Sequence, residues 1–395
     1  MRVGIYNQPA QGGIGGAEIS AAVLAEALAR NGHRIDLVHH KPYLNRERLA
    51  EISGTDLMEV RLRHVAVEPY SFGSTHNPLH RYKDALNWQR ALSEPYDLFI
   101  NFTHGFPPFC HSDIGVLVVL FPFDQPIHLR LLERRPPGYT SWNSFKSVYH
   151  QWEWNKRLDS YHIKSVISEF SRNWTRRRWG VDCEVVYPPV DTRFEERAKR
   201  DLILSVGRFT ITGHSKKQLE MMTAFAELPK DARIDWDYFS IGGVSDGLPD
   251  IDYFRSVACL AHQCGAQALA NVTRRRLRLL YEQAKVFWHA AGYGEDESSP
   301  ELSEHFGIAT VEAMSAGCVP VVIDKGGQRE IVQHGVSGFL WRTLEELNGY
   351  TELLMRNEKL RRVMQKAARD RAVIFSREQF LGRFLRLIKE PAVSV

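Results

Sequence analysis

The chain has 395 residues, of which 44% are hydrophobic and 25% are charged, and its formal net charge is +4. This length exceeds one comfortable hydrophobic core, so the composition predicts two globular domains and excludes an intrinsically disordered chain. No apolar run is long enough to span a membrane, and the sequence at Met1–Val3 does not resemble a signal peptide. The five Cys are scattered and indicate neither a disulfide framework nor a zinc site. We therefore expect a cytoplasmic protein.

Strand and helix patterns alternate along the first half of the chain. A helix is expected over 17–30, ended by Asn31-Gly32. Strands are expected at 2–6, 34–38, 97–102, 116–121, 165–167 and 184–187. This alternation predicts an α/β fold with parallel sheets that are covered by helices on both faces.

Two loops of this half are candidates for a ligand site. Gly15 and Gly16 close a Gly-rich turn before the first helix, which either connects strand to helix only or lets the backbone approach a diphosphate. His104 follows the strand 97–102, and Asp124 follows the strand 116–121. Ligands bind beyond the carboxyl ends of parallel strands, although both residues could equally be ordinary polar residues at strand ends.

A basic, Trp-rich segment covers residues 130–180. This segment contains eleven Lys and Arg but only four Asp and Glu, and it contains five of the nine Trp of the chain. A solvated helix face with core Trp is the favoured interpretation. The alternative is peripheral contact with an anionic membrane surface or a lipid-diphosphate acceptor. No nucleic-acid module surrounds its run of three Arg.

A Pro-rich and charged stretch, 187–201, reads as an interdomain linker. A second α/β series follows, with strands expected at 202–206, 236–241 and 286–289 and helices at 217–227, 252–262, 273–283, 344–355 and 358–371. Ser376 and Gln379 form a possible capping box for a last helix whose one face carries Phe380 and Phe384. We therefore expect domains at 1–190 and 191–375, with the helix 376–395 packing on the first.

Three residues of the second half could contact a diphosphate or its sugar. Arg208 follows the strand 202–206, and Lys216 opens the next helix, so both can reach one anion. Neutralising a departing diphosphate is what transfer from a nucleotide sugar requires. Solvated lysines are the alternative. His289 leaves the strand 286–289 and is a further candidate for the ligand site.

Glu304 and Glu312 stand eight positions apart in the most informative segment, 301–323. If a helix starts near Gly307, the amides of Phe306, Gly307 and Ile308 have no intrahelical acceptor and favour an anion. Glu304 would lie beside that anion, and Glu312 could accept hydrogen bonds from a ribose diol. Two Glu at this spacing also occur by chance in helical stretches.

The run Glu-His-Phe-Gly-Ile, followed by Val-Glu-Ala-Met-Ser-Ala-Gly-Cys-Val-Pro-Val-Val, resembles the signature of the retaining glycosyltransferase family 4. So does Gly-Gly-Gln-Arg-Glu-Ile-Val at 326–332. The resemblance extends over nearly the whole chain and is clearest over 165–345. It implies the GT-B fold, in which two facing Rossmann-like domains hold the ligand in the cleft between them.

By this resemblance the protein is a retaining, metal-independent hexosyltransferase of polysaccharide or glycolipid synthesis. Arg208 and Lys216 would hold the diphosphate with the amides at 306–308, and Gly15-Gly16 would approach it. Glu304 would bind donor-sugar hydroxyls, and Glu312 the ribose. Members often carry a His in a loop like that of His104. Many also place one where this chain has Leu120–Asp124, and this chain lacks it.

Trp288-His289-Ala290 and Gly213-His214-Ser215-Lys216 look closest to mannosyltransferases of lipid-linked oligosaccharide synthesis and their bacterial relatives. GDP-mannose is therefore favoured over a UDP-hexose as donor, and no further cofactor is expected. A lipid-linked sugar is one candidate acceptor, reached at the inner membrane face. Two alternatives stay open: a sugar-nucleotide epimerase on the same architecture, and a degenerate transferase that binds the donor without turnover.

Overall fold

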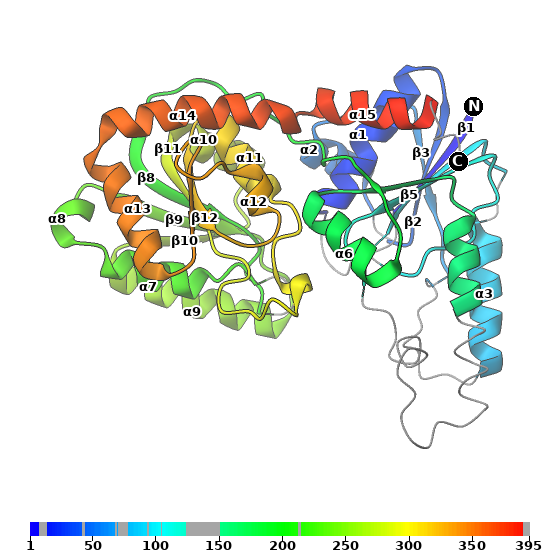
Figure 1. The fold of residues 1–395 in the computed structure, drawn as a ribbon, viewed down its shortest axis with the longest axis horizontal. Helices are drawn as coiled ribbons and strands as arrows, with labels where there is room; N and C mark the ends of the chain where they lie inside the picture. The colour runs from blue at the N-terminus through cyan, green and yellow to red at the C-terminus, as the bar shows by residue number, and fades with distance from the viewer. Residues whose placement is uncertain are drawn as a thin grey trace. The chain divides into compact units, whose positions relative to one another are not determined.

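The computed structural model describes residues 1–7, 14–41, 44–67, 69, 78–92, 95–103, 105–123, 151–211 and 215–389. The chain divides into two compact units, Met1–Val186 with the segment from Leu381 onward, and Tyr187–Phe380 (Figure 1). Val190 forms a bridge with Ser376, and both residues belong to the second unit.

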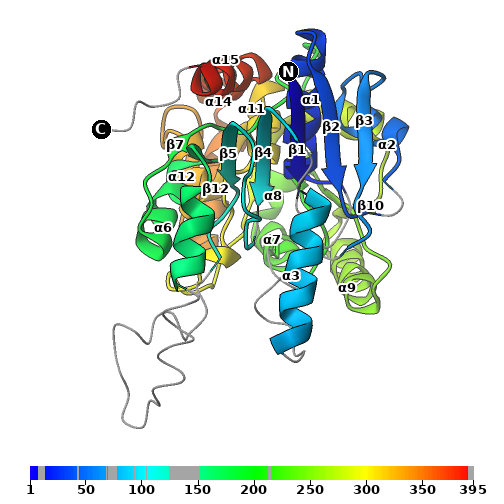
Figure 2. The same ribbon diagram turned by 90° about the vertical axis from the view of Figure 1, so that its right-hand side faces the viewer.

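The described part of the first unit contains a seven-stranded parallel sheet in the order β3-β2-β1-β4-β5-β6-β7. Figure 2 shows β1, β2 and β3 side by side, with β4 next to β1. Its strands are β1 (Arg2–Asn7), β2 (Arg34–His39), β3 (Val60–His64), β4 (Leu98–Thr103), β5 (Ile114–Val119), β6 (Ile163–Val166) and β7 (Glu184–Val185). Every residue of β4 is buried, as expected for a central strand covered on both faces.

Helices of the first unit include α1 (Gly16–Arg30), α2 (Arg46–Ser53), α3 (Pro78–Leu92), α6 (Glu169–Trp179) and, from Leu381 onward, α15 (Arg377–Lys389). Two Trp of the basic segment belong to the core: Trp154 and Trp179 are buried, with ring centroids 4.9 Å apart. Trp152 is 55% exposed, and Trp142 lies outside the described residues. The segment thus contributes to the core as well as to the surface.

The second unit has six described strands in one parallel sheet, in the order β10-β9-β8-β11-β12-β13. They are β8 (Arg200–Val206), β9 (Asp237–Gly242), β10 (Gln267–Ala270), β11 (Ala284–His289), β12 (Val319–Ile323) and β13 (Phe339–Trp341). The two parallel-sheet α/β units expected from the sequence are thereby confirmed.

Helices cover both faces of this second sheet. On one face α7 (Gln218–Glu227) packs against α9 (Leu248–Cys264) and α13 (Leu344–Arg356). On the other, α11 (Ile308–Ser315) packs against α10 (Arg274–Gln283) and α14 (Glu358–Ala372), as Figure 1 shows. Trp288 and Trp341 are fully buried in the core between them. Among the described residues, no helix is long and apolar enough to cross a bilayer.

Candidate functional site

Three polar side chains of the second unit meet beyond the carboxyl end of β11. Lys216 stands just before α7, His289 ends β11, and Glu304 lies in the loop that leads to α11. Lys216 Nζ is 2.6 Å from Glu304 Oε2, and His289 Nε2 is 2.8 Å from the same oxygen. The sequence singled out each of these residues, and the structure brings them into direct contact.

Charge and burial set the protonation states of this cluster. Burial acts to raise the pKa of Glu304, but the charge of Lys216 and the hydrogen bond from His289 hold that pKa well below its usual range. Burial lowers the pKa of His289, against the effect of Glu304. Since a carboxylate can only accept, His289 Nε2–H donates to it. The other ring nitrogen, Nδ1, is buried and has no hydrogen-bond partner in the part of the chain that the structure describes.

Two glycines support the loop that carries Glu304. A Cβ on Gly326, whose φ is +58°, would lie 2.3 Å from the carbonyl oxygen of Glu304. A Cβ on Gly327 would lie 2.6 Å from Phe306 Cα. The amide of Gly327 also donates to the carbonyl of Glu304 at 2.8 Å. The close approach of these two backbone segments fixes where the Glu304 carboxylate stands.

The helix expected near Gly307 begins at Ile308, with Gly307 as its N-cap at φ +126°. The amides of Thr310 and Val311 bond back to the carbonyl of Gly307 at 3.0 and 3.2 Å. Phe306, Gly307 and Ile308 therefore precede the first bonded amides of α11. This is the arrangement in which helix-start amides and the helix dipole favour an anion.

Arg208 follows β8 but does not join the cluster. Its side chain is exposed, and its charge acts on Asp250. Its backbone is fixed, because Gln218 Nε2 donates to the carbonyls of Gly207 and Arg208 at 3.2 and 3.0 Å. A Cβ on Gly207 would lie 2.5 Å from Lys216 Cγ, so the glycine leaves the space that the Lys216 side chain occupies.

Glu312 has different neighbours from Glu304. Burial raises its pKa, and the charge of Arg274 opposes that rise without cancelling it. Tyr281, also on α10, is fully buried beside it, and its pKa is raised by burial and by the charge of Glu312. Glu312 therefore belongs to a group of side chains around α10, separate from the contacts of Glu304.

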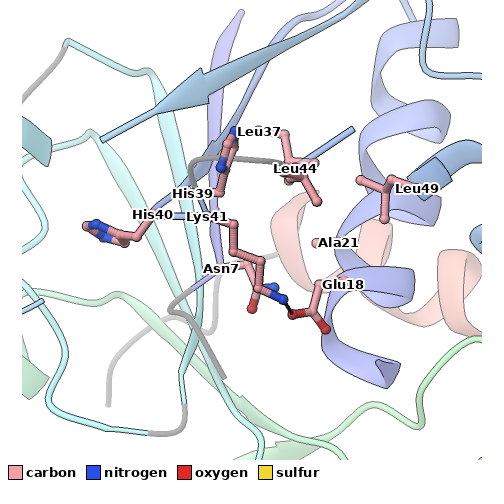
Figure 3. A pocket seen from close by; sticks show the side chains of 9 residues that line it. All are labelled: Asn7, Glu18, Ala21, Leu37, His39, His40, Lys41, Leu44 and Leu49. Carbon is pink, nitrogen blue, oxygen red and sulfur yellow. Dashed lines mark hydrogen bonds and ion pairs between the residues drawn. The ribbon is translucent and has the colours of Figure 1, made fainter. Parts of the chain in front are cut away.

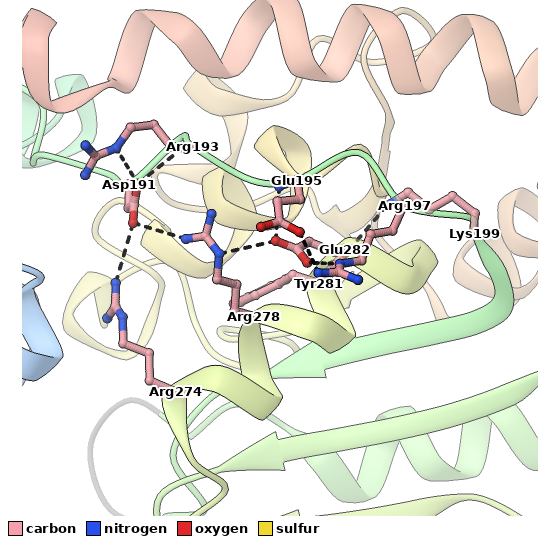
Figure 4. Close-up of polar contacts among 9 residues, drawn as sticks. All are labelled: Asp191, Arg193, Glu195, Arg197, Lys199, Arg274, Arg278, Tyr281 and Glu282. Atoms are coloured by element: carbon pink, nitrogen blue, oxygen red, sulfur yellow. Dashed lines mark hydrogen bonds and ion pairs between the residues drawn. The ribbon is translucent and has the colours of Figure 1, made fainter.

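Residues of α10 also hold the segment that enters β8, as Figure 4 shows. Glu282, 1% exposed, accepts hydrogen bonds from the amide of Glu195 at 3.1 Å and from Arg197 Nε at 2.7 Å. Asp191 Oδ2 lies 3.4 Å from Arg278 Nη1 and 3.8 Å from Arg274 Nη2. The same helix thus connects the linker to the surroundings of Glu312.

In the first unit, Gly15 and Gly16 stand at the start of α1. The Gly15 amide already donates to Glu18 Oε2 at 2.9 Å, and Glu18 Oε1 accepts from Lys41 Nζ at 2.8 Å. A diphosphate that approached Gly15 would have to exchange the first of these bonds. His104 and Asp124 lie outside the described residues.

Sequence reasoning missed Arg274, Tyr281 and Gln328. Arg274 and Tyr281 lie on one face of α10. The sequence of this helix does not single them out, because their significance depends on their proximity to Glu312. Gln328 is fully buried, and within the described ranges neither polar atom of its amide has a hydrogen-bond partner. A Cβ on Gly307 would lie 2.6 Å from Gln328 Nε2, so this amide packs beneath the start of α11.

Two family models match the chain. The model described as glycosyl transferases group 1 matches residues 191–371, and that described as glycosyltransferase family 4 matches residues 14–194. A GDP-Man:Man(3)GlcNAc(2)-PP-Dol alpha-1,2-mannosyltransferase of Dictyostelium discoideum is 28% identical over 282 residues, 62% of this chain and 52% of that protein. The human alpha-1,3/1,6-mannosyltransferase ALG2 is 24% identical over 54% of each chain. The chain spans about half the length of these relatives.

Solved structures agree on the fold. A glycosyltransferase from Rickettsia africae aligns with a TM-score of 0.69 at 16% identity, over 100% of this chain and 99% of that chain. Anabaena HepE, solved in complex with UDP and glucose, aligns with a TM-score of 0.65 at 16% identity, over 99% and 100%. With the two parallel sheets, these likenesses confirm the GT-B class of fold.

Proposed function

The chain belongs to glycosyltransferase family 4, and from that membership we propose that it transfers a hexose from a nucleotide sugar to an acceptor hydroxyl with retention at the anomeric carbon. The observation that carries the proposal is the convergence of Lys216, His289 and the start of α11 on Glu304. Such a site combines positive charge and amide donors, which stabilise a departing diphosphate, with a fixed carboxylate.

Glu304 binds the donor sugar in this proposal. Both hydrogen bonds described for its carboxylate fall on Oε2, which leaves Oε1 to accept from a sugar hydroxyl. Because the carboxylate is ionised and held from two sides, it accepts without reorganising. Rigid, pre-oriented groups of this kind are the ones that add most to transition-state stabilisation.

Lys216 neutralises the leaving diphosphate. In the free protein its ammonium is paired with Glu304, so a bound diphosphate shares or replaces that contact. The exposed Arg208 side chain supplies a second positive charge from the end of β8. The amides of Gly307 and Ile308 bond phosphate oxygens, and Glu312 accepts from the ribose hydroxyls. Protein groups alone supply this positive charge, so the reaction we propose needs no metal ion.

Mannose is the favoured hexose, because two of the related proteins are mannosyltransferases by name and one of them uses a GDP-mannose donor. A UDP-hexose is the second candidate donor, since HepE binds UDP and glucose. The Dictyostelium relative acts on a dolichol-linked sugar. A lipid-linked sugar is accordingly the acceptor class we favour for this chain, reached from the cytoplasm at the inner membrane face.

A donor screen with paired lysine variants tests the proposal. GDP-mannose, UDP-glucose and the free nucleotides are tested by thermal shift, because a ligand that binds only the folded state raises the midpoint. We expect GDP-mannose to raise it for the wild type. The hexose should then be transferred to octyl mannoside, and NMR of the product should show that the anomeric configuration of the donor is kept. We expect the same product in the presence and absence of EDTA.

Lys216→Met is the informative variant and Lys217→Met its matched control, because Lys217 Nζ pairs with Glu295 Oε1 instead of Glu304. Loss of one charge at the leaving group should lower turnover about 10²–10³-fold in Lys216→Met only. Equal turnover of the two variants would remove the leaving-group role. A product formed from donor alone, with no glycoside, would indicate an epimerase, and donor binding without turnover a degenerate transferase.

A further inference from the structure

The first unit contains a small cavity beyond the carboxyl ends of β1 and β2, shown in Figure 3. Its volume is about 10 Å³, which is room for one water-sized group and too little for a sugar ring. Lining residues come from β1, α1, β2, α2 and the connection between β2 and α2: Asn7, Glu18, Ala21, Leu37, His39, His40, Lys41, Leu44 and Leu49. The cavity combines apolar walls with a few polar groups.

Two polar side chains of this wall are nine-tenths buried and incompletely bonded. Asn7 is 8% exposed and His39 is 7% exposed. Among the residues that the structure describes, neither Asn7 Oδ1 nor His39 Nδ1 has a hydrogen-bond partner. Leaving a buried polar atom without a partner is unfavourable, so such atoms call for a ligand or a water.

His40, the next residue in the chain, has a hydrogen-bond partner for each of its ring nitrogens. Its Nδ1 bonds the carbonyl of Val65 at 3.0 Å, and its Nε2 bonds the hydroxyl of Tyr6 at 2.8 Å, which in turn accepts from Trp88 Nε1 at 3.2 Å. Figure 3 shows its ring turned away from the other lining side chains. The backbone of Lys41 interacts with the His39 ring, but His39 Nδ1 has no partner among the described residues. The two neighbouring histidines therefore differ in their hydrogen bonding.

The charges around the cavity cancel. Lys41 Nζ pairs with Glu18 Oε1 at 2.8 Å, and Figure 3 shows this pair beside Asn7. Burial, and then the nearby His64, lower the pKa of His39 to about 4, so its ring is neutral at physiological pH. A site with no net charge and with unpaired amide and imidazole atoms suits hydroxyl groups better than a phosphate or a carboxylate.

We propose that this cavity is a subsite for one hydroxyl group of an uncharged saccharide, with Asn7 Oδ1 and His39 Nδ1 as its hydrogen-bond partners. The saccharide ring stays outside, because only hydroxyl-sized groups fit. The inference rests on the proposed function, since it assigns a neutral sugar to the acceptor side of a glycosyltransferase. It makes the cavity a determinant of acceptor recognition, not of donor binding.

The test uses the full chain and three probes that share one tail: octyl α-mannoside, octyl β-glucoside and octyl phosphate. Binding is measured by saturation-transfer NMR in the presence of GDP. We expect at least one octyl glycoside to bind the wild type, and octyl phosphate not to displace it. His39→Gln removes the Nδ1 position and should weaken glycoside binding about tenfold, as one lost hydrogen bond in a buried site predicts. His39→Asn keeps a polar atom near Nδ1 and should restore most of it.

Controls separate this proposal from the function on which it rests. His64→Gln changes an exposed neighbour of His39 that does not line the cavity, so glycoside binding should stay as in the wild type. GDP-mannose should raise the thermal midpoint of every variant equally, which also shows that each is folded. Equal glycoside binding by wild type and His39→Gln, or tighter binding of octyl phosphate, would overturn the subsite.

Donor binding without any glycoside binding would mean that the cavity holds only water, and it would leave the transferase proposal standing. A wild type that binds neither donor nor glycoside would instead overturn the proposed function itself.

Discussion

Glu304 and Glu312 lie eight residues apart in one segment, yet their surroundings differ. Lys216 and His289 contact one oxygen of Glu304 and hold its pKa well below the usual carboxyl range. Glu312 lies beside α10, where burial raises its pKa despite the charge of Arg274. Ionisation is therefore favoured at the first carboxylate and costly at the second.

This difference shows that spacing alone does not give two carboxylates the same role. Glu304 is already paired in the free protein, so a ligand finds it ionised and immobile. Glu312 carries an uncompensated desolvation cost, which hydrogen bonds from a ligand diol would relieve. A variant of either residue should therefore change stability and donor affinity in different proportions.

The largest effect is expected for Glu304→Gln. It leaves the Lys216 ammonium without its charged partner, and breaking a buried ion pair from one side costs about 3 kcal/mol. Both side chains are less than one-fifth exposed, so solvent relieves only part of that cost. Urea unfolding at pH 7 measures the change in free energy of unfolding. A variant as stable as the wild type would show that the Glu304 cluster is not a stabilising pair.

Glu312→Gln should show the opposite balance. Donor affinity should fall about tenfold, since a hydrogen bond to a charged acceptor contributes about 1.5 kcal/mol or more. Above the folded pKa of Glu312 the free energy of unfolding should rise, because the variant removes a carboxyl group whose ionisation burial disfavours. Titration calorimetry with GDP-mannose and urea unfolding give the two quantities. Loss of both donor affinity and stability in Glu312→Gln would contradict the proposed difference between Glu304 and Glu312.

The pH dependence of the two variants should separate the regions further. The folded pKa of Glu304 is lowered, so its stabilisation is present above the usual carboxyl pKa of about 4.3 and is lost as pH falls through the folded value. The folded pKa of Glu312 is raised, so its contribution is full below that usual value and is lost as pH rises through the folded one. Unfolding free energies from pH 3 to 8 should therefore show Glu304→Gln approaching the wild type in acid. Parallel curves for the two variants would contradict both assignments.

The smallest effect is expected for Gln328→Met, which tests the support beneath the Glu304 loop. Methionine keeps the length of the side chain and removes two buried polar atoms for which the described residues offer no partner. Stability should rise by about 1 kcal/mol, which corresponds to a midpoint roughly 2 °C higher. Differential scanning calorimetry measures the shift. A lower midpoint would mean that the amide is satisfied by bound water.

The sequence predicted most of the α/β series, because long apolar runs and helix ends are local signals. The helix start at Ile308 and the strand ending at His289 follow the expected positions within one residue. β3 was missed because Val-Arg-Leu-Arg-His alternates with charge and reads as a surface segment, and β13 was missed because it has only three residues. Short or polar strands form only because a neighbouring strand is already in place.

The sequence could predict the parts of the site that lie within one short segment. It could not predict contacts between residues that are far apart in the sequence. Phe306, Gly307 and Ile308 are adjacent in sequence, so a helix start was sufficient to single them out. The pairing of Lys216 with Glu304 spans 88 residues and that of Lys217 with Glu295 spans 78, so no local pattern shows which carboxylate each lysine contacts. The surroundings of Glu312 and Gln328 depend on packing that no local pattern records.

The order in which the chain is synthesised affects how the first unit can fold. The first unit takes its last element from the far end of the chain: within α15, Arg383 donates to the carbonyl of Val185 at 3.4 Å, and Phe384 is buried. Domains generally fold as they leave the ribosome, amino-terminal ones first. Here the earliest-made sheet cannot gain its final covering helix until the other unit has been translated. A polypeptide stalled before residue 381 would therefore expose apolar surface to chaperones, however complete its second sheet.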